Sequence, residues 1–161
     1  MERDVKNADN TLARATKLLL DFMFYAGIVI TVTLPWTVKW LGAQKFIQEL
    51  LPNFADSYRE VTVVYFVLGV AALVLVNELR RIFRTVLAGD CFVEANVESL
   101  KRMGSISFFI ALMSAVRIVV YLSIAMIVVV FVFLIAGMFS KVLAQVFKQA
   151  VEYKLENDLT I

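Results

Sequence analysis

The side chains that could take part in chemistry are few and interrupt long apolar runs. The chain of 161 residues has no histidine, and its one cysteine is Cys91. Histidine is the commonest general base and metal ligand, so both kinds of chemistry lack their usual residue. Polar residues occur within or beside the apolar runs at Asp21, Asn77, Glu78 and Arg117. Because no phosphate-binding loop, metal-ligand cluster or nucleophile with a base is present, the sequence predicts no enzyme activity, no metal and no cofactor.

Ion pairs at the ends of the apolar runs are the simplest interpretation of two of these residues. A charged side chain inside a membrane span is a candidate functional residue, because burying it in hydrocarbon costs several kcal/mol. Asp21 and Glu78, however, lie within about a turn of the polar segments that flank their runs. Basic partners are available there at Lys17, Arg80 and Arg81. We therefore expect ion pairs that set helix register, with a functional site as the alternative.

The composition is that of a membrane protein. Apolar residues make up 61% of the chain and charged residues 19%, with a mean hydropathy of +0.80. A soluble domain of this length still exposes roughly a third of the surface of its unfolded chain and could not hide so much apolar area. The net charge is +2, without the dense basic face of a nucleic-acid-binding protein. The sequence therefore predicts the lipid bilayer as the main solvent and no direct contact with nucleic acid.

We expect an all-α membrane fold of one domain, residues 1–161, with four transmembrane helices near residues 18–38, 58–79, 103–120 and 122–146. The first apolar run covers about 30 Å as a helix, which is the thickness of the hydrocarbon core. It is too long for a cleaved signal peptide and ends at Trp36 and Trp40, which are typical of a membrane interface. The apolar spacing in residues 43–51 then predicts a short helix, either flat on the outer membrane surface or packed on the outer ends of the spans.

The last two spans come from one apolar stretch, residues 103–140. A single helix of that length would measure about 57 Å, nearly twice the thickness of a bilayer. A tight hairpin is therefore favoured over one long helix that projects into water. The turn is expected between Arg117 and Ser123, in a segment that contains neither glycine nor proline. Arg117 would then extend its side chain to the outer headgroups.

Basic residues predict which side of the membrane the connections face. They are concentrated in two segments, at Arg3, Lys6, Arg14 and Lys17 and at Arg80, Arg81, Arg84, Lys101 and Arg102. The connector 39–60 holds Lys39, Lys45 and Arg59. Because an excess of basic residues marks the cytoplasmic side, the N terminus and the loop 80–102 are expected there. Four spans return the C-terminal tail, residues 147–161, to the same side.

The cytoplasmic segments are expected to be helical extensions of the spans. The second helix should stop at Gly89, and a new helix should start near Phe92 with Asp90 as its N-cap. Cys91, between them, is expected to be structural or incidental rather than a reactive thiol. After the fourth span an apolar stripe continues at Leu143, Val146, Phe147, Ala150 and Val151. Either the region 82–100 or a partner protein must cover this stripe, and packing within the chain is the simpler expectation.

The chain resembles a known protein family in two cytoplasmic segments, LAGDCFVEANVESLKRMG and QAVEYKLENDLTI. The family consists of uncharacterised small bacterial four-helix inner-membrane proteins, often encoded beside a small Xre/Cro-type helix-turn-helix regulator. The resemblance covers roughly the second half of the chain and rests on Gly89, Phe92, Asn96, Leu100 and Gly104 in the loop and Glu156, Asn157, Asp158, Leu159, Thr160 and Ile161 in the tail. It implies a location in the bacterial cytoplasmic (inner) membrane and a transcription regulator as partner.

The first functional hypothesis is an interaction or sensor protein of the membrane. It would bind a cytoplasmic helix-turn-helix regulator through the loop and the tail, both of which are expected on the cytoplasmic side. The candidate partner-binding residues are Phe92, Asn96, Leu100, Glu156, Asn157, Asp158, Leu159 and Ile161.

The second hypothesis is a small transporter or permeation subunit that works as a homo-oligomer. Four glycines would permit close approach of helices, at Gly27, Gly69, Gly104 and Gly137. A polar path through the membrane would favour this hypothesis, but no span has an acidic residue at its middle. An enzyme that acts on lipid is a third alternative, for which no acid, base, nucleophile or metal site is visible.

Overall fold

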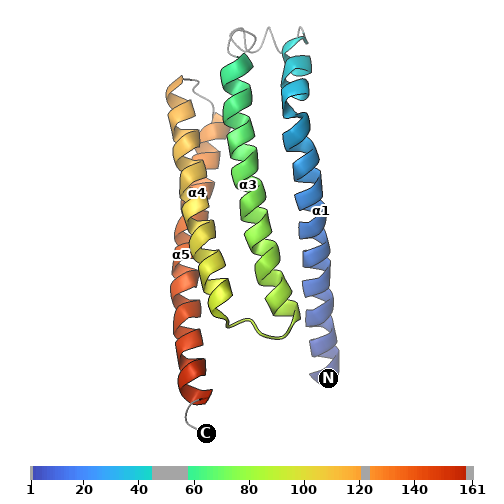
Figure 1. Cartoon of the computed structure of the whole chain (residues 1–161), viewed down its shortest axis with the longest axis vertical. Helices are drawn as coiled ribbons and strands as arrows, with labels where there is room; N and C mark the ends of the chain where they lie inside the picture. The colour runs from blue at the N-terminus through green and yellow to red at the C-terminus, as the bar shows by residue number, and fades with distance from the viewer. Residues whose placement is uncertain (1, 45–57, 121–123, 159–161) are drawn as a thin grey trace.

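Four long α-helices make up nearly all of the chain that the structure describes. The computed structural model describes residues 2–44, 58–120 and 124–158. Its helices are α1 (Glu2–Gly42), α3 (Tyr58–Leu87), α4 (Glu94–Val120) and α5 (Ile124–Asp158), as shown in Figure 1. Each contains a segment long and apolar enough to cross a membrane. The expected all-α membrane fold is therefore confirmed, whereas most of the short helix expected at 43–51 lies outside the described residues.

The helices extend well beyond the apolar runs at one end of the molecule. α1 begins at Glu2 rather than near residue 18, and α5 continues to Asp158. No glycine or proline interrupts residues 2–25, so nothing in that segment stops the helix that the apolar run begins. The part of α5 from Lys141 to Asp158 is about 27 Å long at 1.5 Å per residue. The apolar core of the fold thus carries long helical extensions on one side.

The helices pack in chain order, α1 against α3, α3 against α4 and α4 against α5. Figure 1 shows the N terminus, the connection from α3 to α4 and the C terminus at the same end of the molecule. We call this the charged end; it comprises residues 80–102 and the part of α5 that follows Lys141. The chain reverses between Val120 and Ile124, within the segment where the sequence predicts the hairpin turn.

α4 and α5 form a closely packed hairpin with small residues at the contact. These buried residues recur every three or four positions, at Gly104, Ser107, Ala111 and Ser114 on α4 and at Gly137, Ser140 and Ala144 on α5. A Cβ atom added to Gly137 would lie 3.2 Å from the Gly104 carbonyl oxygen and 3.1 Å from the Phe108 ring. The two backbones are therefore so close that a methyl group at Gly137 would disturb the contact.

Glycine also sets the approach of α1 to α3. A Cβ atom on Gly27 of α1 would lie 2.8 Å from Cδ2 of Leu73, and one on Gly69 of α3 would lie 3.0 Å from Oγ1 of Thr31. All four glycines that suggest an oligomer interface in the sequence thus face neighbours within the chain: Gly27, Gly69, Gly104 and Gly137. They give no separate argument for a homo-oligomer.

The outward faces of the helices carry large apolar side chains. Phe22 and Trp36 on α1 and Ile135 on α5 are all exposed. In water such a surface would be costly, at about 25 cal/mol for each Å² of apolar area. Lipid chains remove that cost, so the distribution of exposed apolar residues agrees with helices that lie in a bilayer.

Candidate functional site

The charged end begins where α3 is stopped by Gly89. This residue has a φ of +83°, a conformation that glycine adopts without strain. The Asp90 amide donates to the Thr85 carbonyl at 3.2 Å and the Gly89 amide to the Val86 carbonyl at 3.1 Å. This pair of bonds is the Schellman motif, which satisfies the last carbonyls of a helix. The helix stop predicted at Gly89 is therefore confirmed.

Asp90 does not cap α4, and the prediction that it does is wrong. α4 begins at Glu94, later than the start expected near Phe92, and the carbonyl of Val93 accepts its first bonds. The Asp90 carboxylate instead accepts from Nζ of Lys154 on α5, at 2.9 and 3.0 Å. The long-range ion pair holds the carboxylate away from the amides of α4 and fastens the end of α5 to the connection between α3 and α4.

Asn96 holds this connection to both neighbouring helices. Its side chain is 1% exposed, and its Nδ2 donates to Oγ1 of Thr85 at 2.7 Å and to the Cys91 carbonyl at 2.8 Å. The Thr85 hydroxyl in turn donates to the Ile82 carbonyl at 2.7 Å. The amide of Asn96 is thus used inside the chain, where it fixes the path of the connection, and Cys91 contributes its backbone to this arrangement.

The apolar stripe of α5 packs on the region 82–100, as the sequence predicts. A cluster forms from Ile82, Leu100 and Ala144, with Val86, Met103, Leu143 and Phe147 packed against it. The rings of Phe92 and Phe147 lie 5.4 Å apart between centroids, and Val151 is buried. One member of the predicted stripe differs, since Val146 is 53% exposed. The chain itself therefore covers most of the stripe.

Glu78 is the centre of a buried ionic cluster between α3 and α4. It is 4% exposed and accepts from the Ser99 hydroxyl at 2.7 Å. Guanidinium nitrogens of Arg81 and Arg102 lie 3.5 and 3.6 Å from its Oε1 atom, and Arg102 also pairs with Glu98. Arg81 was an expected partner. Ser99 and Arg102 could not be found from the sequence, because they depend on how α4 is rotated against α3.

A second ion pair joins α1 to α3. Nε of Arg80 lies 2.5 Å from Oδ1 of Asp21, and its guanidinium carbon lies 4.4 Å from the centre of the Phe24 ring and 5.6 Å from that of Tyr25. The expected interpretation of Asp21 as an ion-pairing residue is confirmed. Lys17, the other basic residue expected nearby, makes no ion pair with the residues that the structure describes.

Arg117 lies at the opposite end of the molecule and contacts α3. Its guanidinium carbon is 5.5 Å from the centre of the Tyr65 ring, a distance at which the cation and the ring attract each other. The side chain is half-buried, so extension to the outer headgroups does not describe it fully. The aromatic partner was missed because it belongs to another helix. Asn77, the remaining polar candidate, is half-buried on α3.

The candidate partner-binding residues fall into three groups. Asn96 and Leu100 are buried in the contacts described above, so they can support a partner-binding surface but cannot contact a partner themselves. Phe92 is 46% exposed, and Glu156 and Asn157 are exposed near the end of α5. Asp158 is the last residue of α5. Leu159 and Ile161 lie outside the described residues.

These features define a multi-pass helical membrane protein with an ordered polar end. The chain belongs to the family described as protein of unknown function DUF2975, whose sequence profile matches residues 40–161. The match includes α3, α4 and α5 in full, and so extends beyond the second half of the chain in which the resemblance was seen. No curated protein and no solved structure is significantly similar to the chain.

Proposed function

We propose that this protein is a membrane-resident partner that binds a cytoplasmic transcription regulator at its charged end. The observation that carries the proposal is an exposed face of α5 in the part that projects past Lys141. Val146 and Tyr153 are seven residues apart and therefore lie on the same side of the helix, and Tyr153 is 71% exposed. Apolar and aromatic side chains on a projecting helix are typical of helix-in-groove recognition.

The proposed surface lies beside a packed side of α5. That side, about 100° around the helix, packs through Phe147 on Phe92, and Lys154 pairs with Asp90. A helix fixed in this way loses little conformational entropy when a partner binds, and such preorganisation favours affinity. Phe92 and Glu156 are also exposed near this segment and extend the surface.

The orientation of the charged end follows from its basic residues. Arginine and lysine are enriched in the N-terminal segment and in residues 80–102, which supports a cytoplasmic location for both. Both termini lie at this end in Figure 1, so all three segments would share the cytoplasm of a bacterial cell with the regulator.

The class of regulator comes from the family resemblance. Relatives are often encoded beside an Xre/Cro-type helix-turn-helix protein, and the acidic tail is the most specific part of the likeness. In the proposal, the regulator contacts DNA and the membrane protein contacts only the regulator, without a reaction or cofactor of its own. Retention at the membrane would lower the concentration of regulator that is free to bind its operators.

Co-purification with the regulator encoded beside the gene tests the proposal. Deletion of residues 157–161 should leave membrane insertion intact, because it removes no residue of an apolar span, yet it should abolish capture of the regulator. Tyr153→Ala should weaken capture at least tenfold, since aromatic anchors often contribute 2 kcal/mol or more to binding, by a rough estimate. The matched control is Glu152→Gln, which changes the neighbouring exposed residue.

Each outcome of this experiment tests one part of the proposed interface. Full capture by the truncated chain would exclude the tail from the interface, and full capture by Tyr153→Ala would exclude the exposed face of α5. Loss of folding in the truncated chain would show that the tail is structural. No specific observation favours the transporter, because its glycines face neighbours within the chain.

A further inference from the structure

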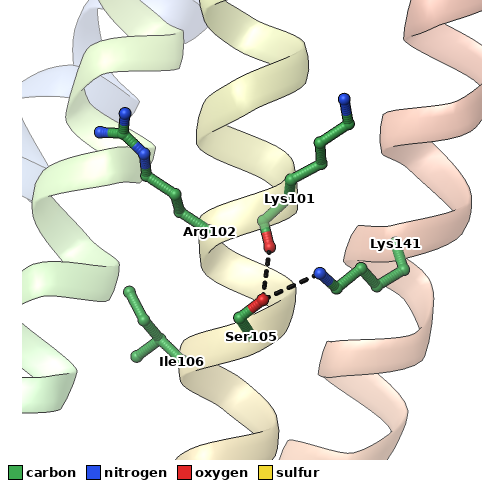
Figure 2. Close-up of a pocket in the computed structure, with 5 residues that line it drawn as sticks. All are labelled: Lys101, Arg102, Ser105, Ile106 and Lys141. Atoms are coloured by element: carbon green, nitrogen blue, oxygen red, sulfur yellow. Dashed lines mark hydrogen bonds between the residues drawn. The ribbon is translucent and has the colours of Figure 1, made fainter.

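A basic hollow lies on α4 and α5, where the apolar segment of α4 begins and that of α5 ends. It has a volume of about 290 Å³ and opens to the surroundings. Five residues line it, as Figure 2 shows: Lys101, Arg102, Ser105, Ile106 and Lys141. Three of the five side chains are cationic and one, that of Ser105, carries a hydroxyl group. The hollow therefore presents positively charged hydrogen-bond donors near the end of the apolar segments, where the headgroups of a bilayer would lie.

The charges of Lys101 and Lys141 are not compensated by an ion pair within the described residues. Arg102 points toward α3 in Figure 2 and pairs there with Glu78, and it also pairs with Glu98 on α4 itself. Lys101 and Lys141, by contrast, make no ion pair with any residue in the described ranges 2–44, 58–120 and 124–158. Two uncompensated ammonium groups beside one hollow favour an anionic ligand.

Lys141 is preorganised for such a ligand. Its Nζ donates to Oγ of Ser105 at 2.8 Å, and that hydroxyl donates to the Lys101 carbonyl at 3.1 Å. A Cβ atom on Gly104 would lie 2.9 Å from both Cγ and Cε of Lys141. The absence of a side chain at Gly104 thus lets the lysine stem lie across α4, and the ammonium group is held at the hollow instead of extending freely into water.

An exposed apolar surface adjoins the hollow on its membrane side. On α4, Phe109 and Leu112 follow Ser105 by one and two helical turns on the same face, and both are exposed. On α5, Met138 precedes Lys141 by about one turn and is exposed as well. A ligand with an anionic head in the hollow would therefore have its apolar part beside these side chains.

We propose that the hollow binds the phosphate of an anionic phospholipid, with the acyl chains along α4 and α5. Basic pockets between membrane helices are suited to anionic headgroups, and each lysine near such a surface contributes about 1 kcal/mol. The site is independent of the proposed regulator contact, because the hollow lies at the membrane boundary and that contact lies farther along α5.

Native mass spectrometry of the full chain in neutral detergent tests the site. Phosphatidylglycerol should be retained in preference to phosphatidylcholine. The double variant Lys101→Met and Lys141→Met should bind phosphatidylglycerol about 25-fold more weakly, about fivefold for each charge removed, with phosphatidylcholine unaffected. Methionine keeps the length of the stem that covers Gly104, so packing is preserved. The matched control Lys148→Met removes an exposed lysine outside the hollow and should change retention less than twofold.

Three results would overturn the site. An equal loss of phosphatidylglycerol binding in the control variant would mean that the overall positive charge of the protein attracts the lipid. Equal retention of both lipids by the unaltered chain would exclude recognition of the anionic headgroup, and displacement of the lipid by equimolar glycerol phosphate would assign the hollow to a soluble anion. If the double variant does not fold, Lys101→Met alone removes an exposed charge and should weaken retention about fivefold; an unchanged value would again exclude the site.

Discussion

Arg80 on α3 donates through Nε to the carboxylate of Asp21 on α1, across 59 residues of sequence. The arginine side chain is 10% exposed and the aspartate side chain 36%. Among the described residues, α1 approaches α3 and no other helix. This ion pair and the cation–π contact of Arg80 with Phe24 therefore help to hold α1 in register against α3.

Asp21→Asn should lower the free energy of unfolding by about 2 kcal/mol. The substitution leaves the buried guanidinium of Arg80 without its counter-charge, which costs about 3–5 kcal/mol in a fully buried pair. The expected value is smaller because Asp21 is partly exposed. Unfolding by a denaturing detergent, followed by circular dichroism, measures the change. Arg84→Gln is the control, because Arg84 is exposed on α3 and makes no ion pair with the described residues. An equal loss there would contradict the special role of Arg80.

The apolar runs predict the membrane fold well because hydropathy is a local property. The four helices, the reversal after Val120 and the stop at Gly89 all follow from residues close in sequence. The partners of Glu78 and Asp90 cannot be predicted in this way. Ser99 reaches Glu78 because of how α4 is rotated against α3, and Lys154 reaches Asp90 because α5 docks on the connection. The early start of α1 was missed for another reason: polar residues give no hydropathy signal even when they continue a helix.

Asn96→Ala should destabilise the connection between α3 and α4 by about 2 kcal/mol. The substitution leaves the Cys91 carbonyl without its donor in a buried site, and such losses cost about 1–3 kcal/mol. Asn96→Asp should be worse, because a carboxylate would face that carbonyl. Hydrogen exchange should become faster in residues 88–93 and remain unchanged in the middle of α4. Glu98→Ala, at an exposed position two residues away, should have little effect, and equal exchange in both variants would refute the role of Asn96.

Gly89→Ala should cost about 1 kcal/mol through backbone strain alone. An added Cβ atom would meet no atom within 4 Å, so steric overlap with other residues does not contribute. The φ of +83° is unfavourable for alanine by about 1–2 kcal/mol. Asparagine tolerates this conformation better, so Gly89→Asn should retain most of the stability. Thermal unfolding in detergent compares the two variants, and equal losses would show that the strain argument is incomplete.

The topology predicts that the connection from α3 to α4 and the end of α5 lie on the same side of the membrane. In a Cys91→Ser background, single cysteines introduced by Ala88→Cys and Asn157→Cys should be protected from a membrane-impermeant maleimide in intact cells and react after permeabilisation. Gln44→Cys, beyond the other end of α1, should react in intact cells. The structure supports this pattern because α4 and α5 pack closely as a hairpin, so that a Cβ atom added to Gly137 would lie 3.2 Å from the Gly104 carbonyl oxygen. Reaction at Asn157→Cys together with protection at Ala88→Cys would show that residues 103–140 cross the membrane once, and the hairpin would not exist in the cell.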